Sequence, residues 1–559
     1  MNSLVVAVAA FVAFILAYRF YGTFIAEKVL GVDPDRKTPA HEFRDDVDFL
    51  PTRREILFGH HFTSIAGAAP IVGPAIAVIW GWVPAILWVV FGAIFMGAVH
   101  DLGSLIVSAR HKGRSISELT EDLVGPRART LFLLLTFFAL LIVIAVFGLV
   151  IAVLFTNYPQ SVFPVWMEIP IAIGIGYWIY RGGGNPVVAG IVAIILLYIT
   201  VVIGVYLPIE IPAFIGGNIT LTWVIILLVY AYIASTLPVW VLLQPRDYIN
   251  SHQLFVGLTL MILGLLIARP EIVAPAINLS AEGAPPFVPF LFITIACGAI
   301  SGFHSMVSSG TTVKQLNTER DARTIGYGGM MMEGVLATLA ILAATAGFAS
   351  REAWQAHFSS WSAANGLGAK VSAFVDGGVT FVSAIGIPSD IAAGILAVLV
   401  VSFAATTLDS ATRIQRYIIA ELAEDYNLKA LTGRHPATII AVGTAFLLAS
   451  IDGGRGGLIL WPLFGATNQL MAGLALLIIS VWLLKLRRPT VYTLIPMAFV
   501  LAMTSWAMVV NVRNYLASGN MLLFVLGLGI IALEIWLIYE ALVVWNRARP
   551  GVALEQAGD

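Results

Sequence analysis

Charge and cysteine are both scarce in this chain, and each shortage narrows what the protein can be. Charged residues make up 11% and hydrophobic residues 59% of its 559 positions, whereas a soluble domain carries about 25% charge. The single cysteine, Cys297, excludes an intrachain disulfide and a cysteine-based metal cluster. A net charge of -1 without a basic stripe argues against nucleic acid as a partner. The composition indicates an integral membrane protein.

Motifs of ATP-driven transport and of metalloenzymes are missing as well. The glycine-rich turn at 182–186 lacks the lysine of a phosphate-binding loop. His60, His61, His100 and His304 could in principle converge on a metal ion, but no HExxH or comparable ligand spacing is present. We therefore expect no enzyme activity and no cofactor other than H⁺ or Na⁺ as a coupling ion.

Apolar runs long enough to cross a bilayer recur along the chain. The first lacks a basic leading segment and is interpreted as a retained helix. A run at 370–386 is interpreted as re-entrant or interfacial. The others predict an all-α integral membrane protein with about fifteen transmembrane helices. They lie near residues 2–21, 56–80, 83–109, 130–155, 165–181, 185–207, 219–243, 253–269, 287–312, 325–349, 389–409, 436–451, 457–484, 492–511 and 521–545.

Lysine and arginine segregate between the two sets of loops that these spans define. If the N-terminus is outside, most basic residues fall in the cytoplasmic loops. The outer loops then hold only Arg269, Arg351, Lys370, Arg455 and Arg513. Basic residues concentrate on the cytoplasmic side, so the pattern predicts an N-out, C-in topology.

The run from residue 56 to 81 contains Gly67, Pro70, Gly73 and Pro74, which a plain spanning helix would avoid. Each proline removes a backbone donor and clashes with the preceding turn. In lipid, the freed carbonyls find partners only where protein or a watery cavity surrounds the break. We interpret the run as a broken helix whose unwound middle binds substrate, with candidate residues Gly67, Ala68, Ala69, Pro70 and Gly73.

A second span carries a similar signal. Ser235 and Thr236 precede Pro238 within 219–243, five helices after the first broken span and running in the opposite direction. Paired broken helices in two halves of inverted topology are typical of a transporter site. The sequence thus predicts a five-plus-five inverted-repeat core. Its expected parts are an extra N-terminal helix at 1–22, repeats at 56–207 and 219–409, and C-terminal helices at 436–545.

Hydroxyl side chains in 287–312 suggest a cation site. Ser301, Ser305, Ser308 and Thr312 share one helix face, with Ser309 beside them. If this span faces the first broken helix, these hydroxyls and freed carbonyls near Ala66 could coordinate sodium. The sodium candidates are Ala66, Ser305, Ser308 and Ser309. Tight helix packing through small residues is the alternative explanation.

Ionisable groups inside spans face the protein interior by default. His60, His61, Asp101 and Glu333 are candidates for carrying a coupling proton, because histidine and partly buried carboxylates can titrate near neutral pH. Structural pairing is the alternative, with Lys314 or Arg323 as partners of Glu333. Asp409 is interpreted as a structural partner of Arg413, four residues on.

Several long blocks resemble the carbon starvation protein A (CstA) family. They spread from about residue 47 to 480 and read FLPTRREILFGHHFTSIAGAAPIVGPAIAVIWGW, AVHDLGSLIVSARHKGRSISEL, SGFHSMVSSGTTVKQLNTERDARTIGYGGMMMEG, AATTLDSATRIQRYIIAE and LWPLFGATNQLMAGLAL. The resemblance implies a prokaryotic inner-membrane protein related to the amino acid–polyamine–organocation transporters, with a LeuT-like core. It also implies uptake of peptides and pyruvate when carbon is scarce.

Together these features predict a secondary active importer of a small carboxylated nutrient, pyruvate or short peptides, coupled to protons or sodium. An ion channel lined by the proline breaks and a membrane protein with a histidine metal site are the alternatives. The expected partners are the solute and membrane lipid. The oligomeric state is not determined by the sequence.

Overall fold

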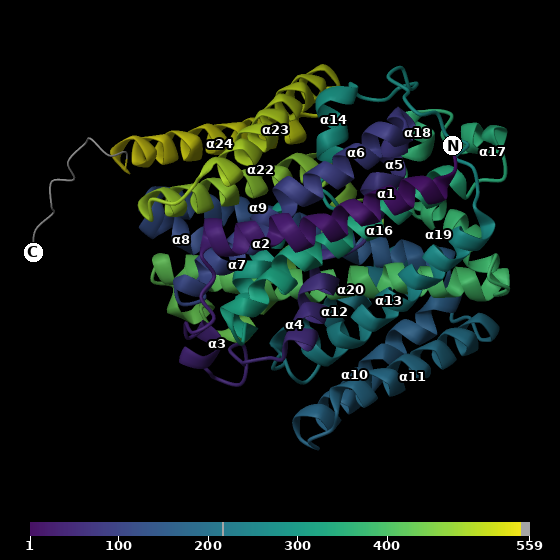
Figure 1. Cartoon of the computed structure of the whole chain (residues 1–559), viewed down its shortest axis with the longest axis horizontal. Helices are drawn as coiled ribbons and strands as arrows, with labels where there is room; N and C mark the ends of the chain where they lie inside the picture. Colours follow the sequence, from purple (N-terminus) through teal and green to yellow (C-terminus); the bar gives the residue numbers. More distant parts are fainter. Residues whose placement is uncertain (215–216, 549–559) are drawn as a thin grey trace, which may run out of the picture.

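Helices account for the architecture of residues 1–214 and 217–548, which the computed structural model describes. Two isolated β-bridges, Asn2 with Glu271 and Thr52 with Leu316, are the only β pairing within these ranges. Most long helices run roughly parallel (Figure 1). The N-terminus lies at one end of this bundle, and α24 ends at the opposite end (Figure 1). The all-α prediction is confirmed.

The first half of the chain supplies thirteen helices, and α1 continues through α2 to Leu30 as one rod. The helices are α1 Ser3–Leu16, α2 Gly22–Phe24, α3 Pro39–Glu42, α4 Arg54–Ile65, α5 Ala69–Ala77, α6 Trp82–Gly92, α7 Ala98–Arg110, α8 Ile116–Leu123, α9 Pro126–Asn157, α10 Val162–Tyr180, α11 Pro186–Tyr206, α12 Ile219–Thr236 and α13 Leu243–Ala268.

The second half contains the short helices α14, α15, α17 and α18 among longer ones. They are α14 Phe287–Thr294, α15 Gly302–Val307, α16 Gly328–Ala346, α17 Arg351–His357, α18 Trp361–Ala364, α19 Leu367–Ser383, α20 Ser389–Asp425, α21 Arg434–Ser450, α22 Gly456–Lys485, α23 Val491–Ala517 and α24 Met521–Ala548.

Twelve helices in the described ranges are long and apolar enough to cross a membrane. The pair α4 and α5, bent by 45°, makes a thirteenth crossing if counted as one span. The other two expected spans take different forms. The 287–312 span is split into α14 and α15, and the 436–451 span is α21, whose 17 residues make a short rod. The expected count of about fifteen is therefore not met by continuous helices.

Helix α19 crosses the end of the bundle rather than its interior. A β-carbon on Gly347, just after α16, would lie 2.3 Å from the Gly377 α-carbon. A β-carbon on Gly264, near the end of α13, would lie 2.0 Å from the Phe381 carbonyl oxygen. The second half of α19 thus contacts the ends of α13 and α16, at the end of the molecule where the N-terminus lies (Figure 1). This placement agrees with the interfacial interpretation of 370–386.

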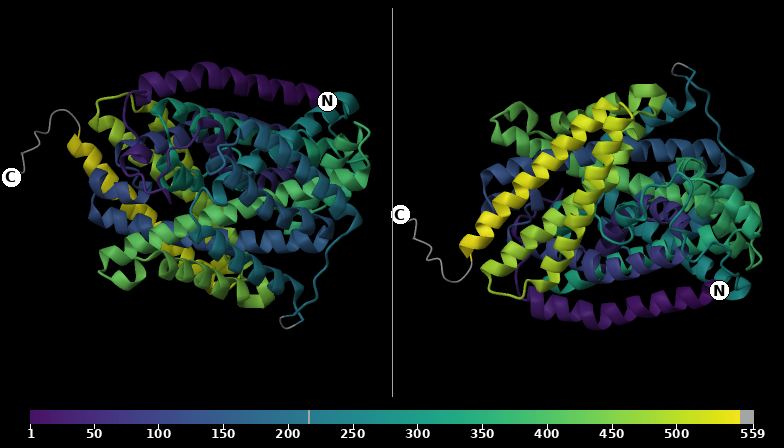
Figure 2. Two further views of the ribbon diagram at one scale, coloured as in Figure 1. Left: turned by 90° about the horizontal axis from the view of Figure 1, so that it is seen from below. Right: turned by 90° about the horizontal axis from the view of Figure 1, so that it is seen from above.

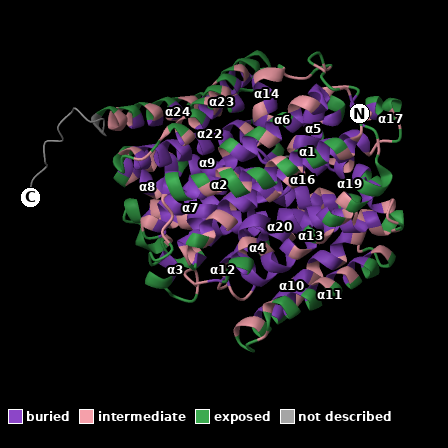
Figure 3. Ribbon diagram, viewed as in Figure 1, coloured by how far each residue is buried: buried purple, intermediate pink, exposed green. Residues whose placement is uncertain are grey.

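Burial separates an inner set of helices from an outer set. The most apolar windows of α16 and α22 are each 94% buried, whereas that of α24 is 22% buried. Figure 3 shows exposed residues concentrated on peripheral helices such as α11 and α24. Figure 2 shows α1 along one flank and α23 with α24 across another face. The outer helices present the apolar surface that lipid would cover.

The mid-span break expected before Pro238 is absent. Helix α12 is continuous over Ile219–Thr236, and the chain turns only beyond it, at 237–242. The proline lies past the last helical turn, where its missing N–H disturbs no internal hydrogen bond. The structure places the second interruption between α14 and α15 instead.

Candidate functional site

The first break lies between Ile65 and Ala69. Pro70 falls in the first turn of α5, where a helix needs no donor from it. The Thr407 hydroxyl of α20 donates to the Ser64 carbonyl at 3.2 Å, and the Ser64 and Ser410 hydroxyls are 2.8 Å apart. Helix α20 therefore supplies partners for backbone that the break leaves free. The predicted break of this span is confirmed.

The second break, over residues 295–301, is held by side chains of three other helices. The Gly298 N–H, on a residue with φ of +93°, donates to Glu333 Oε1 at 3.0 Å. Trp88 donates to the Ile295 carbonyl at 3.0 Å. Asn468 accepts from the Phe303 N–H at 3.0 Å and caps α15. Polar side chains thus replace the hydrogen bonds that the helix lost.

The two breaks face each other although they lie more than two hundred residues apart in the sequence. A β-carbon on Gly73 would lie 2.4 Å from the Thr294 carbonyl oxygen. A β-carbon on Gly298 would lie 3.7 Å from the Pro70 β-carbon. Glycine at these positions allows the two backbones to approach closely.

A buried cluster of histidine and carboxylate side chains adjoins the second break. His304 Nδ1 lies 3.0 Å from Asp101 Oδ2, and His304 Nε2 lies 3.2 Å from Glu333 Oε2. His100 Nδ1 lies 2.8 Å from Asp101 Oδ1. All four side chains are fully buried. The cluster links α7, α15 and α16, and it joins two predicted proton carriers through His304.

This cluster also offers ligands for a metal ion. One donor atom each from Cys297, His304 and Glu333 lies within 4.8 Å of the others. The four histidines that the metal-site alternative considered do not converge, because only His100 and His304 reach the cluster. Glu333 contacts His304 rather than the expected Lys314 or Arg323.

His60 and His61 lie in separate surroundings. His60 Nδ1 is 2.5 Å from Asp247 Oδ2 of α13, and its Nε2 is 3.2 Å from the Thr311 hydroxyl. His61 Nδ1 is 3.0 Å from the Thr312 hydroxyl. Both rings are buried and neither lines the cavity described below. Asp247 was not among the predicted proton carriers, although an ionisable residue inside an apolar helix could have indicated it.

Arg246, next to Asp247 in the sequence, belongs to a buried ion-pair network. Arg246 pairs with Asp409 and also donates to the Tyr230 hydroxyl. Arg413 instead pairs with Asp48 at 2.7 Å. The expected pairing of Asp409 with Arg413 is therefore wrong, because α13 packs against α20 and brings Arg246 closer.

The predicted sodium candidates Ser305, Ser308 and Ser309 differ in their hydrogen bonding. The Ser305 hydroxyl donates to the Gly302 carbonyl at 2.7 Å, and the Ser309 hydroxyl donates to the Ser305 carbonyl at 2.7 Å. Such bonds to the preceding turn satisfy the hydroxyls within their own helix. Ser308 Oγ is buried with no hydrogen-bond partner among the described residues. The hydroxyls next to Ser64 and Gly67 are those of Thr407 and Ser410 on α20, which were not predicted.

The second set of substrate candidates lies at the end of α12, away from both breaks. Arg416 donates to the Ser235 carbonyl at 3.1 Å, and Arg434 donates to the Thr236 carbonyl at 3.2 Å. Arginines thus occupy backbone acceptors that precede Pro238. This segment forms a turn held by arginine side chains. It does not line the substrate site opposite the first break, contrary to the prediction from the sequence.

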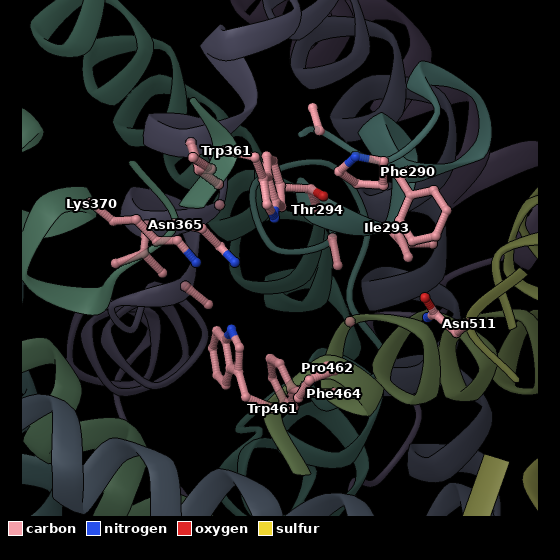
Figure 4. A pocket seen from close by; sticks show the side chains of 18 of the residues that line it. Phe290, Ile293, Thr294, Trp361, Asn365, Lys370, Trp461, Pro462, Phe464 and Asn511 are labelled. Atoms are coloured by element: carbon pink, nitrogen blue, oxygen red, sulfur yellow. The ribbon is translucent and has the colours of Figure 1, made fainter. Parts of the chain in front are cut away.

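A cavity of about 620 Å³ connects the two breaks with the end of the bundle. Figure 4 shows its aromatic and polar side chains around a central space. Among the predicted residues, Ala69 and Gly73 line it, whereas Gly67, Ala68 and Pro70 do not. Its lining also includes Thr294, Trp361, Asn365, Lys370, Trp461 and Asn511.

Known proteins resemble this chain over most of its length. The peptide transporter CstA of Bacillus subtilis is 36% identical over 556 residues, covering 92% of this chain and 91% of the relative. The peptide transporter CstA of Escherichia coli is 34% identical over 569 residues, covering 90% and 80%. The pyruvate/proton symporter BtsT of Escherichia coli is 32% identical over 585 residues, covering 91% and 81%.

The fold also matches a solved transporter structure. MhsT in complex with L-phenylalanine aligns with a TM-score of 0.52 at 13% identity, covering 89% of this chain and 99% of that one. This likeness shows a LeuT-like fold alone. With its apolar helices, the chain is a multi-pass protein of the cytoplasmic membrane. The family description "Carbon starvation protein CstA" matches residues 2–350 and 349–507, and the chain belongs to that family.

Proposed function

We propose that this protein is a secondary active importer of a small carboxylated nutrient, pyruvate or a short peptide, driven by protons. The buried His304–Asp101–Glu333 cluster beside the second break carries this proposal. The relatives are named as peptide transporters and as a pyruvate/proton symporter, which supports both the solute class and the coupling ion. The same names favour a transporter over an enzyme.

The bond between Glu333 and the Gly298 N–H gives the cluster a way to act on the break. An ionised Glu333 accepts this N–H at 3.0 Å and faces His304 at 3.2 Å. Protonation of Glu333 weakens the acceptor and removes the charge opposite the imidazole. The proton would therefore alter the backbone that borders the cavity. Half-helix N-termini at α5 and α15 would attract the solute carboxylate.

The two repeats are best divided differently from the expected 56–207 and 219–409. Helix α4 packs against α13, as α15 packs against α22. Helix α9 packs against α12, as α20 packs against α21. One repeat would contain α4–α5, α6–α7, α9, α12 and α13, and the other α14–α15, α16, α20, α21 and α22. The α10–α11 hairpin, whose two helices pack on each other and against α13 and α20, would be an insertion.

About fifteen crossings with the N-terminus outside agree with this arrangement. The N-terminus and the end of α24 lie at opposite ends of the bundle, which requires an odd number of crossings (Figure 1). The broken α14–α15 segment and the short α21 would complete the count. The cavity, at the end where the N-terminus lies, would then open to the outside.

Uptake into proteoliposomes tests the function. An acidic exterior should drive pyruvate or a dipeptide inward above its external concentration, without any requirement for sodium. Glu333→Gln should reduce this accumulation about tenfold or more, because the coupling proton is lost. Exchange of solute at equal pH should persist in this variant. Glu534→Gln is the matched control, since Glu534 is a buried carboxylate of α24 bonded to Ser505 outside the core.

Three other results would contradict the proposal. Accumulation driven by sodium at equal pH would assign the coupling to the hydroxyl groups beside the first break. Flux that never exceeds the solute gradient, with single-channel currents, would indicate a channel. A stoichiometric metal ion in the purified protein, lost in Cys297→Ser, would indicate a metal site at the cluster.

A further inference from the structure

Lys370 is a buried cation with no partner of opposite charge. It lies on α19, lines the cavity, and is 6% exposed. Among the described residues its side chain forms no ion pair and no hydrogen bond, and its ammonium group lies 6.0 Å from the centre of the Trp461 ring. An unpaired charge removed from water is unfavourable unless a partner arrives. An anion that enters the cavity would supply this partner.

The remaining lining shows what kind of anion would fit. Lys370 is the only charged residue among the described residues that line the cavity. Asn365 and Asn511 add amide groups, whereas Trp361 and Trp461 add aromatic surface. Figure 4 shows Lys370, Asn365 and the two tryptophans around the same space. This combination suits one carboxylate attached to an apolar body.

The volume distinguishes between the two solutes that the proposed function leaves open. Cavities of about 300–1,000 Å³ hold drug-sized ligands, and this one measures about 620 Å³. Pyruvate has six heavy atoms and would leave most of the aromatic lining without contact. A di- or tripeptide would reach from Lys370 towards Thr294 at the second break.

We propose that Lys370 is the recognition residue for the C-terminal carboxylate of a short peptide with apolar side chains, bound in this cavity. The proposal rests on the proposed transport function and specifies its solute. Lys370 would pair with the carboxylate through a charge-assisted hydrogen bond while the tryptophans contact the apolar side chains. The backbone ends at the two breaks would then receive the peptide from this position.

Binding of the dipeptide Ala-Phe and of its C-terminal amide to the purified full-length protein tests the pairing. The wild type should bind the acid about tenfold or more tightly than the amide, because a hydrogen bond to a charged group is lost in the amide. Lys370→Met should bind both equally, and Lys370→Arg should restore the preference. Arg351→Gln is the control, since Arg351 is an exposed cation at the same end of the molecule.

The pH dependence supplies a readout that a structural role would not give. Burial lowers the pKa of Lys370 to about 8, so the preference for the acid should decline as the pH rises through that value. In Lys370→Arg the preference should persist, because guanidinium stays charged. Of the other ionisable groups in this region, Cys297 also lines the cavity. His357 is bonded to the Ala369 carbonyl and Asp376 to Tyr158, whereas Glu282 and Arg513 are exposed.

The outcomes separate this proposal from the proposed function. Proton-driven uptake by the wild type together with an unchanged acid preference in Lys370→Met would overturn the role of Lys370 alone. Binding of pyruvate but not of Ala-Phe would overturn the peptide assignment. Should Lys370→Met fail to fold, a wild-type acid preference that stays constant from pH 7 to 9.5 would equally refute the pairing.

Discussion

Asp48 shows how one surface carboxylate can fix a loop against the helix bundle. It lies before α4 and pairs with Arg413 at 2.7 Å and Arg416 at 3.2 Å, while Tyr417 donates to it at 2.8 Å. Burial alone would raise the pKa of this carboxyl, but Arg413, Arg416 and Lys314 lower it to about 2. The side chain is only 18% exposed, so solvent screens these charges weakly.

Asp48→Asn should therefore destabilise the protein at neutral pH. The pKa falls from 3.8 to about 2 on folding, which corresponds to about 2 kcal/mol of stability that is present above pH 4. That stability is lost as the pH falls through 4 towards 2, because the carboxylate is then protonated in both states. Unfolding midpoints of wild type and Asp48→Asn should differ most at pH 7 and converge at low pH. A constant difference would contradict this electrostatic account.

At the scale of a single element, the unwound segment between α14 and α15 depends on Gly298. Its φ of +93° is strained for any residue with a β-carbon, and that carbon would lie 2.7 Å from the Ala337 β-carbon. Gly386 has a similar φ of +97°, but a β-carbon there would meet nothing within 4 Å. The two positions thus separate backbone strain from a steric clash.

Gly298→Ala should lower stability by about 1–3 kcal/mol more than Gly386→Ala, because overpacking adds to the strain. It should also weaken the bond from the Gly298 N–H to Glu333 and so reduce proton-driven uptake. Chemical unfolding in detergent and uptake assays would measure both effects. Equal losses of stability in the two variants would show that the clash with Ala337 is relieved without consequence.

The arrangement of the whole molecule makes a prediction about orientation. Arg351 follows α16 at the end that we propose faces outside, and Lys429 follows α20 at the opposite end. Both residues are exposed, and the only native cysteine is buried. Single cysteines can therefore report which end is accessible in intact cells.

In a Cys297→Ser background, Arg351→Cys should react with a membrane-impermeant thiol reagent added to intact cells. Lys429→Cys should react only after the membrane is permeabilised, because the reagent cannot cross lipid. The reverse pattern would invert the proposed topology and place the cavity on the cytoplasmic side. Reaction of both from outside would refute a crossing by α20.

Much of the membrane architecture was predictable from the sequence. Hydropathy and length locate most spans because every backbone group in lipid must be satisfied within a helix. Pro70 and Gly67 likewise locate the first break, since a proline and a glycine weaken the same turn. The break predicted at Pro238 is wrong, because α12 ends at Thr236 and a proline beyond the helix end interrupts no helical hydrogen bond.

The sequence by itself determined that this chain crosses the membrane many times and that its second span is broken. Its long sequence blocks also indicated the CstA family. Only the tertiary structure decided which polar groups meet. His304 contacts Asp101 and Glu333, and Arg246 contacts Asp409, across 203, 29 and 163 residues of chain. Because burying a charge costs free energy, the sequence indicates that each charged group inside a span needs a partner. Which partner it contacts depends on the packing angles and registers of helices that are distant in the sequence.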